Sequence, residues 1–531
     1  MTEIDLIDND MDLVPLLNVC DNEELDPLVG IILGKDKSGR ISSELDKTDI
    51  YKKNQPDHSK YSKEIAAEIQ KFGGHTIVNI IRGSGVVFKE IVYDVAKRIK
   101  VKFDGNEKLY TLRTEDIEAK VMLKIVQKAW KKMDEIERYD FIKYLIKNSE
   151  FDFEDIEISS INQKDLSDVL NKINKCERID LTQKELEKID QIFKNLPIEE
   201  FLTNVRIMSN PITMYYMTMI IARASFLVLD IAIPAILTQL ESAAFGPIAW
   251  TVASVLLLID IPGPAFRVTI PSVFYVAYLR QKYKIKKCGL LFYGRSGHGK
   301  TSVINAVANK PIGEIGNIKP TTPQTIIYEL PLFNKKYPLK IADTRGIHES
   351  TSPKNALTQD ATEELRKSLI KHNPAVLAHV INITEIKSMG DDFEIYKQAY
   401  SRMVSSLKIE IPTTVIILNK ADCAGNPRNF PSEENFSIID EIMLYFINDI
   451  INDKAYTELV NDESHKGYKL SGKNKYEYHF VVPVCSYVYE KKPFSLKETW
   501  NIPTLIEIID QLVKDKPYRS LREEHSQIVK T

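Results

Sequence analysis

The stretch LLFYGRSGHGKTSVINAV, residues 290–307, decides the fold of the second half of this 531-residue chain. Its middle follows the pattern G-x-x-x-x-G-K-[S/T] from Gly294 to Thr301. The apolar run GLLFY precedes the pattern as a strand would, and TSVINAVAN follows it as a helix would. Glycines let backbone amides close around phosphate oxygens, and the first turn of a helix adds donors. The stretch therefore predicts a phosphate-binding loop, with Lys300 facing the β- and γ-phosphates and the Thr301 hydroxyl on Mg²⁺.

Two of the stretches that follow the loop predict the rest of a phosphate and magnesium site. In IADTRGI, which follows a strand, Asp343 would hold a magnesium-bound water and the Gly346 amide would sense a γ-phosphate. KPTTPQT, residues 319–325, lies between the loop and Asp343, where a switch segment belongs. The order of these stretches along the chain supports the prediction more than either stretch does alone.

Two further strand ends predict recognition of a guanine base. ILNKADC supplies Asn419, Lys420 and Asp422. A carboxylate at Asp422 accepts hydrogen bonds from both N1–H and N2–H₂ of guanine, whereas adenine presents an acceptor at N1. VVPVCSY ends the last strand, where Ser486 and its neighbour Cys485 would lie beside the base. The ordered set of motifs predicts a domain that binds GTP.

The pattern of apolar and polar residues along the chain predicts three parts. Residues 1–205 carry apolar residues three and four apart and predict a mainly helical module. Residues 206–284 are mostly apolar. Residues 285–531 alternate short apolar strands with amphipathic helices, which predicts an α/β domain with a mostly parallel sheet wrapped by helices and a phosphate loop. A polar insertion before the last strand, AYTELVNDESHKGYKLSGKNKYEYH, is interpreted as a surface loop or small excursion.

Composition narrows the class of protein. The chain has 71 Lys and Arg against 74 Asp and Glu, which argues against broad binding to nucleic acid. Its five cysteines are scattered and odd in number, so we expect reduced thiols in a cytoplasmic protein rather than a disulfide or zinc framework. The start of the chain is acidic where a secretory signal would be basic, and we expect no export.

Residues 286–514 resemble a small GTPase of the translation-factor-related class, in its Era, septin and TrmE branch. KPTTPQT and DTRGIH are similar to sequences of Era-type GTPases. GRSGHGKTS is similar to the phosphate-binding loops of septin and immunity-associated GTPases. The resemblance implies GTP or GDP with Mg²⁺, Thr322 on the metal in switch I, and Asp343 to Gly346 at switch II. Thr321 or Thr325 could replace Thr322, because spacing does not choose among them. The residues implied to contact phosphates are Gly294, Arg295, Ser296, Gly297, His298, Gly299, Lys300, Thr301 and Ser302.

Two departures from related enzymes bear on catalysis. Ile347 stands where Ras-like enzymes carry a water-orienting Gln, and Gly297 stands where potassium-activated relatives place an Asn. Arg345, His348 and His298 are candidates to stabilise transition-state charge, across a homodimer of GTPase domains; the alternative for each is a solvated loop residue. We expect slow intrinsic hydrolysis that a partner or self-association stimulates.

Residues 18–283 resemble a bacterial family of uncharacterised proteins, the YaaW type, also labelled as related to ubiquinol–cytochrome c chaperones. The matching segments are CDNEELDPLV, SKEIAAEIQKFGGHT and FGPIAWTV…DIPGPAFRVTIPSVFYVAYLRQKY. This resemblance brings no established activity. It implies that a recurring module precedes the GTPase domain.

The apolar stretch from Ile207 to Leu279 leaves two interpretations open. It is long enough for two or three membrane helices, and Ser242 to Ile259 carries no charge. Prolines interrupt it and acidic residues would be costly in hydrocarbon, so a helical hairpin buried in protein explains it equally well. We hypothesise that the hairpin is released to the inner membrane in one nucleotide state, and that the basic link RQKYKIKK, residues 280–287, favours anionic headgroups.

Three functions fit these features. The first is a GTP-controlled switch whose front module acts on a membrane surface or protein partner, in stress response or phage defence. The second is a GTPase acting on the ribosome or another assembly without a membrane. The third is a scaffold that nucleotide stabilises, with negligible turnover.

Overall fold

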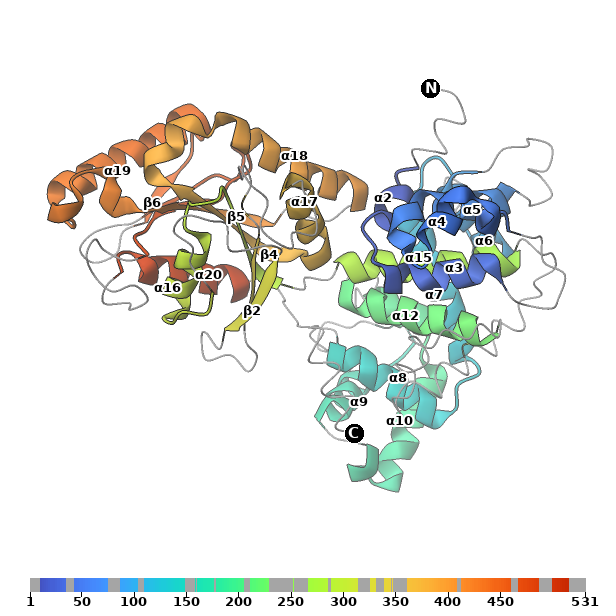
Figure 1. Cartoon of the computed structure of the whole chain (residues 1–531). Coiled ribbons are helices and arrows are strands. Elements are labelled where there is room, and N and C mark those ends of the chain that lie inside the picture. Colours follow the sequence, from blue (N-terminus) through green and yellow to red (C-terminus); the bar gives the residue numbers. More distant parts are fainter. Residues whose placement is uncertain are drawn as a thin grey trace. The chain divides into compact units, whose positions relative to one another are not determined.

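The computed structural model describes most of the chain, and the chain divides into two compact units at residues 285 and 286 (Figure 1). The described residues are 10–34, 43–74, 86–103, 109–148, 158, 160–175, 178–204, 211–228, 252, 266–284, 288–313, 325–330, 339–344, 346, 361–407, 412–459, 467–486 and 499–514.

The described part of the first unit is helical, as its sequence predicts. Its helices are α2 (Val14–Leu17), α3 (Asn22–Leu33), α4 (Asp49–Asn54), α5 (Ser62–Gly74), α6 (Phe88–Arg98), α7 (Thr114–Trp130), α8 (Glu135–Asn148), α9 (Gln163–Lys175), α10 (Gln183–Asn195), α11 (Ile198–Asn204), α12 (Pro211–Val228) and α15 (Phe266–Lys284). Most bury one apolar stripe; Ile91, Val92 and Val95 of α6 are examples.

Helix α15 lies at the centre of this unit. It packs against α12 and also contacts α3, α5, α6 and α7 (Figure 1). Every residue from Val268 to Ala277 is buried, as expected of a helix that is apolar on all sides. The described flanks of the apolar stretch are therefore core of the helical unit. The run from Ser242 to Ile259 lies outside the described residues except for Val252. Among the helices that the structure describes, none combines the length and apolarity needed to cross a bilayer.

The first charges of the basic link after this core have carboxylate partners within the protein. Arg280 pairs with Glu118 at 3.1 Å, and both side chains are buried. Lys282 pairs with Glu24 at 2.6 Å, and Lys284 pairs with Glu115 at 2.7 Å. Carboxylates of α3 and α7 thus neutralise the end of α15. Residues 285–287 lie outside the described residues.

In the second unit the described strands form one eight-stranded sheet in the order β2-β3-β1-β4-β5-β8-β7-β6. β3, β1, β4, β5 and β8 run parallel, while β2, β7 and β6 pair antiparallel. The strands are β1 (Cys288–Tyr293), β2 (Ile326–Leu330), β3 (Leu339–Asp343), β4 (Pro374–Asn382), β5 (Thr413–Asn419), β6 (Thr457–Leu459), β7 (Gly467–Lys469) and β8 (Phe480–Pro483). The polar insertion is thus more than a surface loop, because it supplies β6 and β7.

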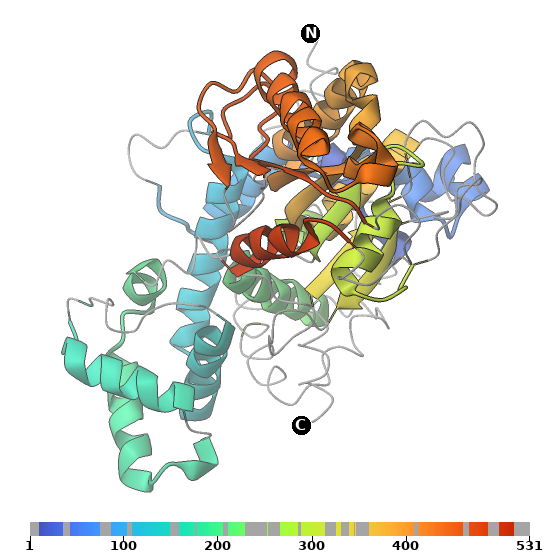
Figure 2. The ribbon, with the colours of Figure 1, turned by 90° about the vertical axis from the view of Figure 1, so that its left-hand side faces the viewer.

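Helices cover both faces of the sheet, as its uninterrupted apolar strands require. α16 (Lys300–Ala308) and α20 (Ile502–Lys514) cover one face, where Val303, Ile304 and Leu505 join the core. α18 (Gly390–Leu407) and α19 (Glu433–Tyr445) cover the other, with α17 (Ala361–His372) beside α18. Figures 1 and 2 show the two groups on opposite sides of the sheet. The parallel strands therefore bring the ends of β1, β3, β4, β5 and β8 to one edge.

Candidate functional site

The loop between β1 and α16 needs its glycines for close packing as well as for conformation. Gly294 has φ +148°, and a Cβ there would lie 2.2 Å from the Val380 carbonyl oxygen. Gly299 has φ +88°, and a Cβ there would lie 2.3 Å from Nδ2 of Asn419. A side chain at either position would meet both strain and a clash. The loop is thereby seated between the ends of β4 and β5.

Lys300 and Thr301 begin α16 at the end of this loop. The Lys300 ammonium is largely buried and donates to the carbonyl oxygens of Gly294, at 3.2 Å, and Arg295, at 3.3 Å. The Thr301 hydroxyl donates to Oδ2 of Asp343 at 2.7 Å. The lysine thus spans the loop, and the hydroxyl meets the carboxylate at the end of β3.

Asp343 offers an oxygen with no partner. Its carboxylate is fully buried, and Oδ1 accepts no hydrogen bond from the residues that the structure describes. Burial raises the pKa of Asp343, while the Lys300 charge and the Thr301 hydrogen bond oppose that rise. A buried carboxylate oxygen beside a threonine hydroxyl is the kind of oxygen set that Mg²⁺ prefers, so these residues fit that ion.

The predicted base-recognition residues also come together. The Asn419 amide donates to the His298 carbonyl at 3.0 Å and accepts from the Ser486 hydroxyl at 3.0 Å. The Lys420 ammonium donates to the Gly297 carbonyl at 3.0 Å. The end of β5 is therefore bonded to both the phosphate loop and the segment after β8.

Asp422 is buried beside the last strand end. Its Oδ1 accepts from the Cys485 thiol at 3.2 Å. The backbone nearby is held by the Ala421 amide, which donates to the Val484 carbonyl at 3.1 Å. The sequence predicts Cys485 as a neighbour of the base, and in the structure its thiol is also a hydrogen-bond partner of Asp422.

The switch residues are only partly described. The backbone of Gly346 lies against the phosphate loop, where a Cβ would come within 2.6 Å of the Ser296 nitrogen. Thr325 shares a hydrogen bond with the Ser368 hydroxyl of α17. The remaining switch candidates lie outside the described residues: Thr321, Thr322, Arg345, Ile347 and His348.

Two loop side chains have carboxylate partners that the sequence did not suggest. Arg295 pairs with Asp392, the two atoms Nε and Oδ2 lying 2.5 Å apart. Nε2 of His298 lies 3.2 Å from a Glu385 carboxylate oxygen. Both acidic residues lie between β4 and the first turn of α18, outside every motif used above, so no local signal identified them.

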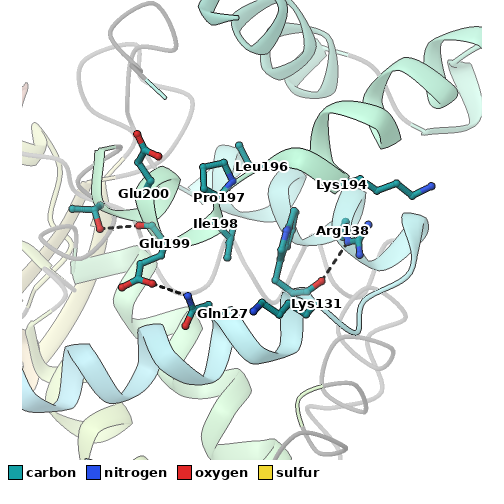
Figure 3. A pocket seen from close by; sticks show the side chains of 11 residues that line it. Gln127, Lys131, Arg138, Lys194, Leu196, Pro197, Ile198, Glu199 and Glu200 are labelled. Atoms are coloured by element: carbon teal, nitrogen blue, oxygen red, sulfur yellow. Dashed lines mark hydrogen bonds between the residues drawn. The ribbon is translucent and has the colours of Figure 1, made fainter. Parts of the chain in front are cut away.

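A separate cavity of about 680 Å³ lies in the first unit (Figure 3). Several of its polar groups bond one another. Gln127 donates to the Glu199 carboxylate at 2.7 Å, Thr203 to the Glu199 carbonyl at 2.8 Å, and Arg138 to the Trp130 carbonyl at 3.3 Å. These contacts hold α7, α8 and α11 together, and none of them points to a ligand.

Comparisons with known proteins find different relatives for the C-terminal and N-terminal regions of the chain. A family model described as "50S ribosome-binding GTPase" matches residues 289–420. A stretch of the tRNA modification GTPase MnmE of Actinobacillus pleuropneumoniae serotype 5b is 27% identical over 164 residues, covering 31% of this chain and 32% of that protein. The C-terminal region therefore carries a GTPase domain, as its motifs predicted.

The other half has different relatives. A UPF0174 protein of Helicobacter pylori strain J99 is 29% identical over 274 residues, covering 51% of this chain and 92% of that protein. The UPF0174 protein YaaW of Escherichia coli O157:H7 is 33% identical over 138 residues, covering 25% of this chain and 56% of YaaW. The predicted resemblance of the N-terminal half to YaaW-type proteins is confirmed.

Proposed function

We propose that this chain binds GTP or GDP with Mg²⁺ at the edge where five parallel strands end, and that it hydrolyses GTP. The observation that carries the proposal is the convergence there of the phosphate loop, Asp343, the Asn419–Asp422 turn and Ser486. Each group comes from a different strand end. Within GTPases, we assign the domain to the Era and septin branch because the sequences of its phosphate-binding loop and switch segments resemble that branch.

The backbone amides from Gly294 to Ser302 would bind phosphate oxygens, with the Lys300 ammonium on the β- and γ-phosphates. Thr301 and Asp343 would hold Mg²⁺, together with Thr322. The ion, when bound, neutralises charge that develops on the phosphate oxygens. The Lys300 ammonium donates to the carbonyl oxygens of Gly294 and Arg295 within the loop, and phosphate oxygens would replace these acceptors.

Asp422 would select guanine by accepting from N1–H and N2–H₂. The Cys485 contact keeps one of its oxygens oriented, and Asn419 joins the base-binding turn to the phosphate loop. Lys420 and Ser486 support the same arrangement through their contacts with Gly297 and Asn419. A base that presents an acceptor at N1 would face an acceptor at Asp422.

Turnover would be slow in the isolated chain. An isoleucine at position 347 has no group that can orient water, so the missing function must come from another residue or molecule. We propose that a second copy, meeting through the GTPase domains, or a protein partner supplies it. Gly346 would sense the γ-phosphate through its amide.

We further propose that nucleotide state controls residues 1–284, with residues 206–284 as the part that contacts a membrane surface or a partner. The protein would then be cytoplasmic and peripheral, or conditionally inserted at the inner membrane, in stress response or phage defence. The description of the matching family favours a second candidate, a GTPase that acts on ribosomes. Fractionation of cell extracts with GDP or a non-hydrolysable GTP analogue separates the two, because only the second places the protein with ribosomes.

The enzymatic proposal is tested on purified full-length protein with Lys300→Ala and Thr301→Ala. Both should abolish phosphate release, because one removes the charge at the phosphates and the other a metal ligand. Lys310→Ala removes an exposed lysine two residues beyond α16 and should leave turnover unchanged. Unchanged phosphate release in Lys300→Ala would refute hydrolysis at this site.

A further inference from the structure

We infer that Asp392 and Glu385 are positioning residues that hold the phosphate loop in its binding conformation through Arg295 and His298. The inference rests on the proposed function. Neither carboxylate contacts a nucleotide in this inference. Each acts through a loop side chain, Glu385 from the connection between β4 and α18 and Asp392 from the first turn of α18.

The stronger contact is bidentate. Arg295 donates from Nε to Oδ2 of Asp392 at 2.5 Å and from Nη2 to Oδ1 at 2.7 Å. Its Nη2 also donates to the Ser388 carbonyl at 3.2 Å. The Asp392 side chain is fully buried, and only 23% of the Arg295 side chain is exposed. Two parallel charge-assisted hydrogen bonds fix orientation as well as distance, and low exposure limits screening by solvent.

The second contact lies three residues further along the loop. Nε2 of His298 lies 3.2 Å from Glu385, and Nδ1 lies 3.3 Å from the Val380 carbonyl. The Asn382 amide orients Glu385 by donating to its other oxygen at 2.7 Å. The Glu385 side chain is 43% exposed, so this contact should contribute less than the Arg295 pair.

Together the contacts restrain the part of the loop that its glycines leave free. Gly294 is packed against Val380 and Gly299 against Asn419, whereas a Cβ at Gly297 would meet nothing within 4 Å. Arg295 and His298 lie on either side of Gly297. A loop that occupies its competent conformation only part of the time binds more weakly in proportion to that fraction. The pairing also neutralises Arg295, so its charge serves the loop's conformation and not the transition state.

The test measures the dissociation constant of Mg²⁺–GDP and single-turnover GTP hydrolysis for full-length Asp392→Asn, Arg295→Lys and Glu385→Gln. We expect Asp392→Asn and Arg295→Lys to weaken GDP binding about tenfold, with a smaller loss for Glu385→Gln, while the rate at saturating GTP is nearly unchanged. Lys387→Gln changes an exposed residue of the same connection and should bind as the wild type does.

Thermal unfolding without nucleotide shows whether a variant keeps its fold. If Asp392→Asn does not keep its fold, Arg295→Gln takes its place in the test, because Arg295 is the partly exposed partner of the pair.

Wild-type affinity in the Arg295 variants would overturn the inference. Tighter binding by Asp392→Asn would overturn it too, since a released guanidinium would then serve the phosphates. A fall in hydrolysis rate without a change in affinity would place Arg295 on the reacting groups instead. If the wild type itself binds no guanine nucleotide, the proposed function fails first.

Discussion

In the proposed site, the carboxylate of Asp422 alone selects guanine over other bases. Asp422→Asn replaces one acceptor oxygen by a donor, which would face the N–H groups of guanine and suit the carbonyl at position 2 of xanthine. We expect about 10- to 100-fold weaker GTP binding and improved binding of xanthosine triphosphate. Competition binding against a fluorescent guanine nucleotide measures both. Equal affinity of the wild type for ATP and GTP would contradict the assignment.

His379 is the residue whose titration should show in stability. It is fully buried in β4, stacked on Tyr293 with ring centroids 4.5 Å apart and edge-on to Tyr396 at 4.4 Å. Burial, with the nearby charges of His298 and Lys300, lowers the pKa of His379 well below its ordinary value. The unfolded chain therefore binds a proton below pH ~6.5 that the folded chain does not.

The unfolding free energy of the GTPase domain should therefore be independent of His379 titration above that pH. Below it, this free energy should fall by about 1 kcal/mol per pH unit. Burial also lowers the pKa of His298, so its protonation should reduce the unfolding free energy in the same pH range. His379→Phe keeps the aromatic stacking and removes the titration, so its decline between pH 6.5 and 5.5 should be shallower. Denaturant unfolding at several pH values measures this. Parallel declines in wild type and variant would rule out His379 as a cause.

At the scale of secondary-structure elements, α15 depends on one buried ion pair. Arg280 donates to Glu118 of α7 and, at 2.7 Å, to the Asp12 carbonyl. Glu118→Gln removes the carboxylate that is paired with the buried guanidinium, and we expect a loss of about 3 kcal/mol in the unfolding free energy of the helical unit. The matched control is Asp116→Asn, also on α7, because its exposed pair with Arg113 should contribute less than about 1 kcal/mol. Similar losses in both variants would mean that burial of the pair is not decisive.

The elements also show what a local pattern can and cannot predict. The strand–loop–helix unit around Gly294 was predicted because its periodicity and its glycines lie within a few residues of one another. β6 and β7 were missed because they are short and polar, and they form strands only by pairing beside β8. α12 and α15 were recognised as apolar, but apolarity alone does not separate a bilayer helix from a buried one.

For the whole molecule, the test is whether nucleotide alters the behaviour of residues 206–284. We expect purified protein to float with liposomes in one nucleotide state, GDP or a GTP analogue, and Leu256→Asp and Leu257→Asp to abolish flotation. Both leucines lie outside the described residues. Because Arg280, Lys282 and Lys284 already have carboxylate partners, flotation should depend little on anionic lipid. Equal absence from the liposome fraction in every nucleotide state would leave the stretch as protein core.

The sequence by itself determined the GTPase domain, its motifs and the helical character of the first unit, because each depends on residue type at short, regular spacing. Only the tertiary structure decided which partners the charged side chains take. Arg280 meets Glu118 across 162 positions, and Arg295 meets Asp392 across 97. No local spacing encodes such pairs, since they arise when strand ends and helix faces far apart in the chain are packed together and buried charges must be matched. Through such pairs, the start of a basic link becomes part of the core and a loop arginine lies on a buried aspartate.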